Sequence, residues 1–334
     1  MKLSEMAKKK IIQKVALTSD SEQGLVVRNT GSAYDVRLDS GETVSSRIKG
    51  NFRIKGIRTT NPVAVGDRVT AVKATDDAWY ITEIHHRSNY IIRRASNLSK
   101  ESHVLAANVD KALLVMTLRD PEVPLTFVDR FLATAEAYRI PAGLILNKCD
   151  TWDAEDREIG EAVKYLYDSL GYPTITVSAL TGEGLDSLRE ATSGKTTLLA
   201  GNSGVGKSSL INALIPGACL RTGEISELYH TGTHTTTFSE MLTLPYSGEI
   251  IDIPGVRSFG TIDFTAEDAG HFFPEIFREG RNCRYSDCRH TGEPGCAVRE
   301  ALEEHRIAES RYASYLSILE EVNDGRSDKY RKPF

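Results

Sequence analysis

The pattern of apolar and polar positions changes about a third of the way along the chain. In residues 11–95 the two kinds of position alternate with period two, for example over residues 34–38, 68–72 and 79–84, and this alternation is typical of half-buried strands. Glycines recur between these segments at intervals typical of turns. The pattern predicts a small closed barrel of about five strands, of the OB-fold type, which often binds nucleic acid.

From about residue 104 the pattern predicts strands and helices in alternation. Apolar, β-branched runs predict buried strands at residues 111–116, 142–146, 174–177, 196–200 and 249–253. Periodic apolar positions predict helices at residues 127–138, 154–170, 209–215 and 297–322. The alternation is typical of a parallel sheet covered by helices on both faces. We therefore predict three domains: an N-terminal arm and barrel over residues 1–98, an α/β domain over 104–262, and a mostly helical domain over 263–334.

A glycine-rich loop lies between a predicted strand and a predicted helix. It fits the pattern G-x-x-x-x-G-K-[ST], and its residues are Gly201, Asn202, Ser203, Gly204, Val205, Gly206, Lys207, Ser208 and Ser209. The glycines let the backbone turn its N–H groups inward, and the start of the next helix adds the positive end of its dipole. In such a loop Lys207 would reach the outer phosphates of a nucleotide, and the Ser208 hydroxyl would ligate Mg²⁺. The loop predicts an α/β P-loop NTPase.

A second motif indicates which base the nucleotide carries. Asn147, Lys148 and Asp150 form an N-K-x-D motif at the end of a predicted strand. The Asp150 carboxylate can accept the ring N–H and the exocyclic amine of guanine, a donor pair that adenine lacks. Asn147 would bind the base and brace the loops, and the Lys148 stem would cover the ring. At the end of another strand, the backbone N–H groups of Ser178 and Ala179 would bind the guanine oxygen.

Two further segments complete the candidate nucleotide site. His234 is followed by three threonines, one of which, taken as Thr236, would complete the Mg²⁺ shell when a γ-phosphate is present. In the D-x-P-G motif, Asp252 would bind Mg²⁺ through water and the Gly255 N–H would bind the γ-phosphate. Related enzymes orient water with a Gln just after this motif, where this chain has Val256. His234 is therefore the candidate catalytic residue, with a capping or RNA-contacting role as the alternative.

These motifs stand in an unusual order. The base-reading residues come before the phosphate loop, the threonines and the D-x-P-G motif, whereas an ordinary small GTPase has them last. The order is that of a circular permutation, and the chain resembles the ribosome-small-subunit-dependent GTPase A family (RsgA, also called YjeQ). The resemblance implies a cytoplasmic enzyme that hydrolyses GTP to GDP and phosphate, is stimulated by the small ribosomal subunit and acts in late maturation of that subunit. It implies GTP, GDP and Mg²⁺ as ligands, and the small subunit and its rRNA as partners.

A cysteine-rich segment near the end of the sequence fits the same family. Cys283, Cys288, His290 and Cys296 follow the spacing C-x4-C-x-H-x5-C. Three thiolates and one imidazole fill a tetrahedral Zn²⁺ shell with no open position, which indicates a structural site; unliganded thiols or a redox pair are the alternatives. Because the D-x-P-G motif leads directly into this segment, we hypothesise that GTP sets the position of the zinc domain relative to the barrel.

Charge and composition limit the possible partners and the cellular compartment. The 334 residues carry a net charge of −5, but residues 1–100 hold 18 Lys and Arg against 10 Asp and Glu, so the remainder is acidic. The basic front indicates a polyanion such as RNA, with a solvated lysine-rich tail as the alternative. No apolar run approaches the ~18 residues of a membrane span, and five cysteines suit a reducing cytosol. We expect a monomer without a membrane partner.

Three other functions remain open at this point. In the first, the protein is a GTP-gated rRNA-binding checkpoint module in which hydrolysis is incidental. In the second, it is a permuted GTPase that acts on the large ribosomal subunit, against which the barrel and the cysteine spacing speak. In the third, it is an ATP-using kinase, which Asp150 argues against.

Overall fold

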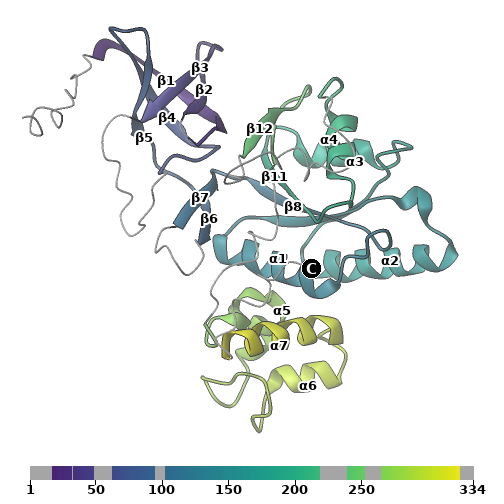
Figure 1. Ribbon diagram of the computed structural model, residues 1–334. Coiled ribbons are helices and arrows are strands. Elements are labelled where there is room, and N and C mark those ends of the chain that lie inside the picture. The colour runs from purple at the N-terminus through teal and green to yellow at the C-terminus, as the bar shows by residue number, and fades with distance from the viewer. Residues whose placement is uncertain are drawn as a thin grey trace, which may run out of the picture.

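The structure is a computed structural model of the chain, and it describes residues 17–31, 33–48, 62–94, 102–218, 239–252 and 265–323. The buried apolar side chains of these residues fall into three clusters. Figure 1 shows the matching parts: a barrel, an α/β unit, and a C-terminal helical unit on a different side of the α/β unit from the barrel. The exact domain limits stay a prediction.

The barrel consists of five strands, as predicted. They are β1 (Leu17–Asn29), β2 (Tyr34–Leu38), β3 (Thr43–Ile48), β4 (Arg68–Ala74) and β5 (Trp79–Ile84). The strands pair in the order β1-β2-β3-β5-β4, and β4 pairs again with β1 and closes the barrel. Alternate side chains point inward, and Val26, Val36, Val69 and Ile81 are fully buried. The order, with only β3 and β5 parallel, confirms the OB-type barrel.

A two-stranded ribbon joins the barrel to the rest of the chain. Its strands are β6 (Tyr90–Arg94) and β7 (Ser102–Ala107). A single parallel bridge pairs Val65, just before β4, with Ala106. Val65 and Ala106 both belong to the core cluster of the α/β unit. The base of the barrel is therefore packed into that core.

The α/β unit has the predicted sheet with helices. Its strands are β8 (Lys111–Met116), β9 (Ala142–Leu146), β10 (Thr174–Thr176), β11 (Thr196–Ala200), β12 (Glu240–Thr243) and β13 (Glu249–Asp252). Its helices are α1 (Leu125–Tyr138), α2 (Ala154–Ser169), α3 (Leu185–Thr192) and α4 (Lys207–Leu214). The strand order is β10-β9-β8-β11-β13-β12, parallel except for β12, which pairs with β1 of the barrel. The strands of the barrel and of the α/β unit thus form one eleven-stranded sheet.

The C-terminal helical unit corrects one prediction. Its elements are η3 (Ala269–Phe272), α5 (Pro274–Gly280), α6 (Ala297–Glu303) and α7 (Glu309–Asn323), so the single helix predicted over 297–322 is wrong. The break comes at His305, which has a φ of 57°. The N–H of Arg306 donates to the carbonyl of Ala301 at 2.8 Å and that of His305 to Leu302 at 3.1 Å, a Schellman-type end. Apolar residues recur at helical spacing on both sides of His305, so the sequence pattern does not indicate the break.

Candidate functional site

The predicted nucleotide motifs meet at one edge of the sheet. The phosphate loop follows β11, the N-K-x-D motif follows β9, Ser178 follows β10, and Asp252 ends β13. These four strands are parallel within the sheet, so their carboxyl ends lie on the same side, where ligands of such sheets bind.

The phosphate loop depends on its glycines. Gly201, Gly204 and Gly206 all have positive φ, which side chains disfavour. A Cβ on Gly201 would lie 2.6 Å from the carbonyl oxygen of Val115, and one on Gly206 would lie 2.3 Å from the Asn147 amide nitrogen. Side chains at these two positions would therefore push the loop off its neighbours.

The remaining loop residues are placed as the motif requires. Ser203 is exposed at the tip of the loop with Gly204, and Val205 is fully buried beneath it. Ser208 and Ser209 lie in the first turn of α4. The first N–H groups of α4 have no partners within the helix, so this end of α4 can bind an anion.

Lys207 and Asp252 face each other across the loop. The Lys207 ammonium donates to the carbonyl oxygens of Gly201 and Asn202, and burial lowers its pKa. Burial raises the pKa of Asp252, the nearby Lys207 lowers it, and Glu240 raises it. Among the described residues, Asp252 Oδ1 is buried and has no hydrogen-bond partner. An anionic oxygen without a partner beside a phosphate loop is a suitable ligand for Mg²⁺ or for a water on that ion.

Asn147 ties the three loops of the site together. Its side chain is buried, and its Nδ2 donates to the Val205 carbonyl at 2.8 Å. The Ala179 N–H donates to Asn147 Oδ1 at 3.3 Å. The phosphate loop, the N-K-x-D loop and the Ser178 loop are therefore held by one side chain, which agrees with its predicted bracing role.

Asp150 is oriented by Ser178. The Ser178 hydroxyl donates to Asp150 Oδ1 at 2.5 Å and accepts the N–H groups of Leu180 and Thr181 at 3.2 and 3.1 Å. Ser178 is fully buried while Asp150 is exposed. The carboxylate is thus fixed from behind and keeps an open side for a ligand.

The loop between β8 and α1 also borders the site, and the sequence did not single it out. The Asp120 carbonyl accepts a hydrogen bond from the Lys148 ammonium. A Cβ on Gly204 would lie 3.3 Å from Pro121 Cδ, so this loop also lies against the phosphate loop. Arg119 holds the loop to the start of α2 through ion pairs. Its position after a parallel strand, at the ligand side of the sheet, is the signal that could have found it.

Three predicted residues lie outside the described part of the chain. They are His234, Thr236 and Gly255. Their roles in catalysis, Mg²⁺ ligation and γ-phosphate binding stay predictions.

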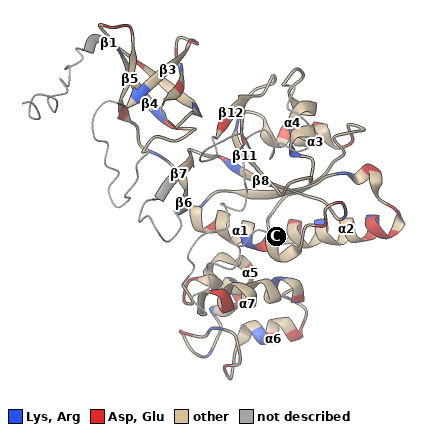
Figure 2. Cartoon of the chain, in the orientation of Figure 1, with Lys and Arg blue, Asp and Glu red and all other residues tan. Residues whose placement is uncertain are grey.

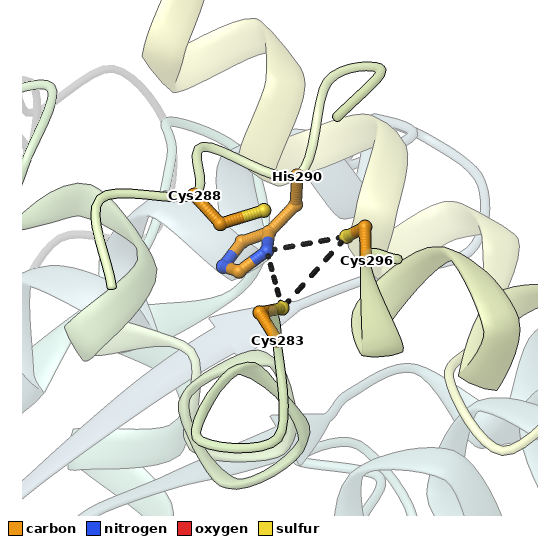
Figure 3. Close-up of side chains that lie close together, drawn as sticks. All are labelled: Cys283, Cys288, His290 and Cys296. Atoms are coloured by element: carbon orange, nitrogen blue, oxygen red, sulfur yellow. Dashed lines mark hydrogen bonds between the residues drawn. The ribbon is translucent and has the colours of Figure 1, made fainter. Parts of the chain in front are cut away.

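The cysteine-rich segment forms a compact cluster in the C-terminal helical unit (Figure 3). One ligand atom from each of Cys283, Cys288, His290 and Cys296 lies within 4.8 Å of the others. His290 Nδ1 is 3.5 Å from the sulfurs of Cys283 and Cys296, which are 3.9 Å apart. Ligands about 2.3 Å from a tetrahedral metal stand roughly 3.7 Å from one another. The cluster therefore has the dimensions of a tetrahedral metal site.

The surrounding contacts hold His290 in place. The Tyr312 hydroxyl donates to the His290 carbonyl at 2.6 Å, and a Cβ on Gly280 would lie 3.2 Å from the ring. Burial lowers the pKa of His290 and raises that of Cys288 to about 12. The site thus keeps the imidazole neutral, and a bound cation would supply the charge that stabilises the thiolates.

Comparisons with known proteins agree with this arrangement. The family model described as RsgA GTPase matches residues 84–262, and the RsgA N-terminal domain model matches residues 23–81. The small ribosomal subunit biogenesis GTPase RsgA of Bacteroides fragilis strain YCH46 is 55% identical over 93% of this chain and 100% of its own. That of Porphyromonas gingivalis strain ATCC 33277 is 56% identical over 93% of this chain and 99% of its own.

Solved structures show the same architecture. The crystal structure of YjeQ from Thermotoga maritima is 32% identical and superposes with a TM-score of 0.74 over 91% of this chain and 99% of that one. YloQ, described as a circularly permuted GTPase, is 28% identical with a TM-score of 0.69 over 95% of this chain and 98% of that one. Among the described residues, no helix combines the length and the apolar character that a bilayer span requires.

Proposed function

Because the chain belongs to the RsgA family of circularly permuted GTPases, we propose that this GTP-hydrolysing enzyme acts in maturation of the small ribosomal subunit. The relatives from Bacteroides fragilis and Porphyromonas gingivalis carry that role in their names. The observation that carries the proposal is the meeting of the phosphate loop with the N-K-x-D and Ser178 loops around the buried Asn147.

In this proposal each part of the site has one task. Asp150, fixed by Ser178, accepts the two guanine donors, and the Ser178 and Ala179 backbone binds the guanine oxygen. The phosphate loop and Lys207 bind the phosphates, and neutralise charge that develops on them. Ser208, Thr236 and Asp252 would hold Mg²⁺ directly or through water, and the bound ion would neutralise negative charge on the phosphates.

We assign water positioning to His234. The position after the D-x-P-G motif is Val256, whose side chain cannot orient water. An imidazole can position or deprotonate an attacking water when binding of a partner brings it within hydrogen-bond reach of that water. This assignment predicts slow turnover by the isolated protein and faster turnover on its partner.

We propose that the cysteine cluster binds one structural Zn²⁺. Three thiolates and an imidazole match the preferred donors of zinc and leave no open position for chemistry. The cluster adjoins the core of the C-terminal helical unit, where Cys296 packs with Val298 and Tyr315. The ion would clamp the long loop between α5 and α6 to that core.

The basic first hundred residues of the chain support rRNA as the contacted part of the partner, and exposed arginines of the C-terminal helical unit add to this support. Arg281, Arg284 and Arg299 of the C-terminal helical unit are exposed, and the Arg284 guanidinium lies over the Tyr285 ring at 5.5 Å. Exposed arginines beside an aromatic ring are suited to phosphates and unpaired bases. Acidic residues gather instead on α2 (Figure 2), which such a partner would avoid. We further propose a cytoplasmic monomer.

The proposal is tested by GTP turnover with purified small subunits, large subunits or none. We expect stimulation by small subunits alone, and loss of that stimulation in His234→Ala. Equal stimulation by both subunits would overturn the assignment to the small subunit. Binding without stimulated hydrolysis would favour a GTP-gated binding module instead.

A further inference from the structure

The barrel contacts the α/β unit at two places of different character. The first, which we call the pivot, lies at Val65, Gly66, Ala107 and Asn108. The Ala107 N–H donates to the Val65 carbonyl at 2.9 Å, and the Asn108 amide donates to the Gly66 carbonyl at 2.9 Å. A Cβ on Gly66 would lie 2.1 Å from the Ala107 oxygen, and Val65 is fully buried. The pivot is therefore tight and lies largely out of water.

The second contact, which we call the latch, joins β1 and β2 to the edge of the sheet. Arg28 of β1 stands opposite Glu240 of β12. The Asn29 N–H donates to the Ser239 carbonyl at a long 3.4 Å. Arg28 and Glu240 are exposed, in contrast to the buried Val65 and Gly66 of the pivot, while Ser239 is buried.

The strongest side-chain contact in the latch comes from Arg37. Its Nη1 donates to Thr243 Oγ1 at 2.6 Å, and its Nη2 forms an ion pair with Glu249. The two charged side chains keep 31% and 15% of their exposure. Arg37 is partly exposed, whereas Glu249 is mostly buried and, among the described residues, its Oε2 has no hydrogen-bond partner. Opening the latch would let water reach both charged groups, so it would leave neither of them buried and unpaired.

The latch is connected to the nucleotide site through one strand. Glu240 stands between Arg28 on β1 and Asp252 on β13, and directly paired residues in a sheet share a face. Glu240 and Asp252 are like charges in direct opposition, which disfavours their pairing. Arg28 relieves this repulsion from the other side.

The C-terminal helical unit is held quite differently. Arg311 of α7 is buried, and it donates to Asp129 of α1 at 2.8 Å and to Glu275 of α5 at 2.6 Å. Opening this contact would strand charged groups that are now fully enclosed. The helical unit is therefore expected to keep its place on α1 throughout the reaction cycle.

We propose that the latch opens when Mg²⁺ and GTP bind, so that the barrel turns about the pivot while the C-terminal helical unit stays on α1. A cation at Asp252 removes the repulsion that Arg28 offsets, so Arg28 loses part of the attraction that holds β1 beside β12. The inference rests on the proposed function, because it assumes GTP and Mg²⁺ at the phosphate loop. It specifies the hypothesis that GTP sets the position of the zinc domain relative to the barrel, with the barrel as the part that moves against the α/β unit.

The experiment measures two distances in the full-length protein by energy transfer. Bioorthogonal dyes on unnatural amino acids avoid labelling the cysteine cluster. One pair joins exposed positions Asp76 on the barrel and Glu303 on α6, and the other joins Glu158 on α2 and Glu303. With Mg²⁺ and a non-hydrolysable GTP analogue, we expect the first transfer efficiency to shift and the second to stay constant.

Variants separate the latch from a general effect on the barrel. Arg37→Ala should show the shifted efficiency without nucleotide, and the exchange Arg37→Glu with Glu249→Arg should restore the wild-type value. Arg68→Ala, which removes an exposed ion pair with Asp39 within the barrel, should behave as wild type. Nucleotide binding is measured in parallel with a fluorescent GTP analogue.

Each outcome decides a different statement. A constant first distance in a protein that binds the analogue overturns the latch and leaves the proposed function standing. A shift of the second distance overturns the fixed position of the C-terminal helical unit. No binding of the analogue overturns the proposed function and the latch together.

Discussion

The two appendages of the α/β unit are both attached through an arginine, and the two attachments differ in burial. Arg311 joins the C-terminal helical unit to α1 with a side-chain exposure of 1%, and its partner Asp129 has none. Arg37 joins the barrel to β13 in partial contact with water. A buried pair is costly to break because each charge would be left without water or partner, whereas water already reaches part of the pair between Arg37 and Glu249 and can replace the lost contact. The same chemistry thus gives one fixed joint and one joint that can open.

The environment of Arg311 explains why its joint is fixed. The Tyr167 hydroxyl also donates to Asp129 Oδ1, at 2.7 Å, so α2 takes part as well. The guanidinium lies over the Phe273 ring at 4.6 Å. Burial acts to lower the pKa of Arg311, yet Asp129 and Glu275 raise it well above its usual range. The cation therefore stays charged inside the protein and binds three elements together.

The largest effect is expected when the metal is removed from the C-terminal helical unit, which is the fixed part in this comparison. Cys296→Ser should lose bound zinc and several kcal/mol of stability in the C-terminal helical unit, because structural zinc contributes about 10 kcal/mol or more at neutral pH. The measurement combines zinc content with proteolysis of residues 265–323. Cys149→Ser, a change at another buried cysteine outside the cluster, is the control and should keep its zinc. Full zinc loading of Cys296→Ser would contradict the assignment.

The next largest effect is expected when a substitution breaks the fixed joint itself. Arg311→Ala leaves Asp129 and Glu275 buried without a counter-charge, which should cost about 3–5 kcal/mol. Urea unfolding monitored by circular dichroism checks this value. The matched control is Arg306→Ala, whose exposed guanidinium pairs with Glu279 and Glu304, and which should cost far less stability than Arg311→Ala. Equal losses of unfolding free energy in the two variants would contradict the proposed difference between the buried and the exposed ion pairs.

A smaller effect is expected at the joint that opens. Arg37→Ala should cost about 1 kcal/mol or less, because water replaces the guanidinium beside Glu249. The same urea experiment measures the loss, and hydrogen exchange shows where it falls. Increased exchange should be confined to β1, β2 and β12. Increased exchange in α7 would show that the two joints are not independent.

The smallest effect is expected from added salt, which should weaken the latch but not the buried Arg311 network. At 1 M salt the screening length is about 3 Å, so the exposed charges of the latch should attract one another less while the buried Arg311 network is unaffected. The barrel distance should therefore shift partway toward its open value between 0.1 and about 1 M salt. If the distance between α2 and α6 changes with salt as much as the barrel distance does, the two joints do not differ in their exposure to water as proposed.

Local patterns predicted the elements that surround the nucleotide site. The strands at residues 111–116, 142–146 and 196–200 begin and end where the sequence predicts. Each is a continuous apolar run bounded by polar or turn-forming residues, as expected for strands buried on both faces. The convergence of the three motifs then follows from the rule that parallel strands present their carboxyl ends together.

The attachments between the parts could not be predicted in this way. Asp129 lies on an otherwise apolar helix face and Arg311 looks like a surface charge, so only their distance in space reveals the pair. No alternation of apolar and polar residues locates strand β3 within the predicted barrel, because its segment Thr43–Ile48 is mostly polar and pairs with β2 and β5. The break at His305 has no glycine to signal it. Contacts between segments that are far apart in the sequence produce no periodic pattern of apolar and polar residues in either segment.

Guanine selection by Asp150 is the central claim, and nucleotide preference tests it most directly. Affinities for GTP, xanthosine triphosphate and ATP are measured for the wild type and for Asp150→Asn. The amide oxygen of Asn can still accept the Ser178 hydroxyl, while its NH₂ would meet the extra oxygen of xanthine. The account predicts that the wild type selects GTP and that Asp150→Asn loses GTP affinity by up to about 10⁴-fold while gaining affinity for the xanthine nucleotide. Wild-type preference for ATP, or an unchanged preference for GTP in Asp150→Asn, would contradict it.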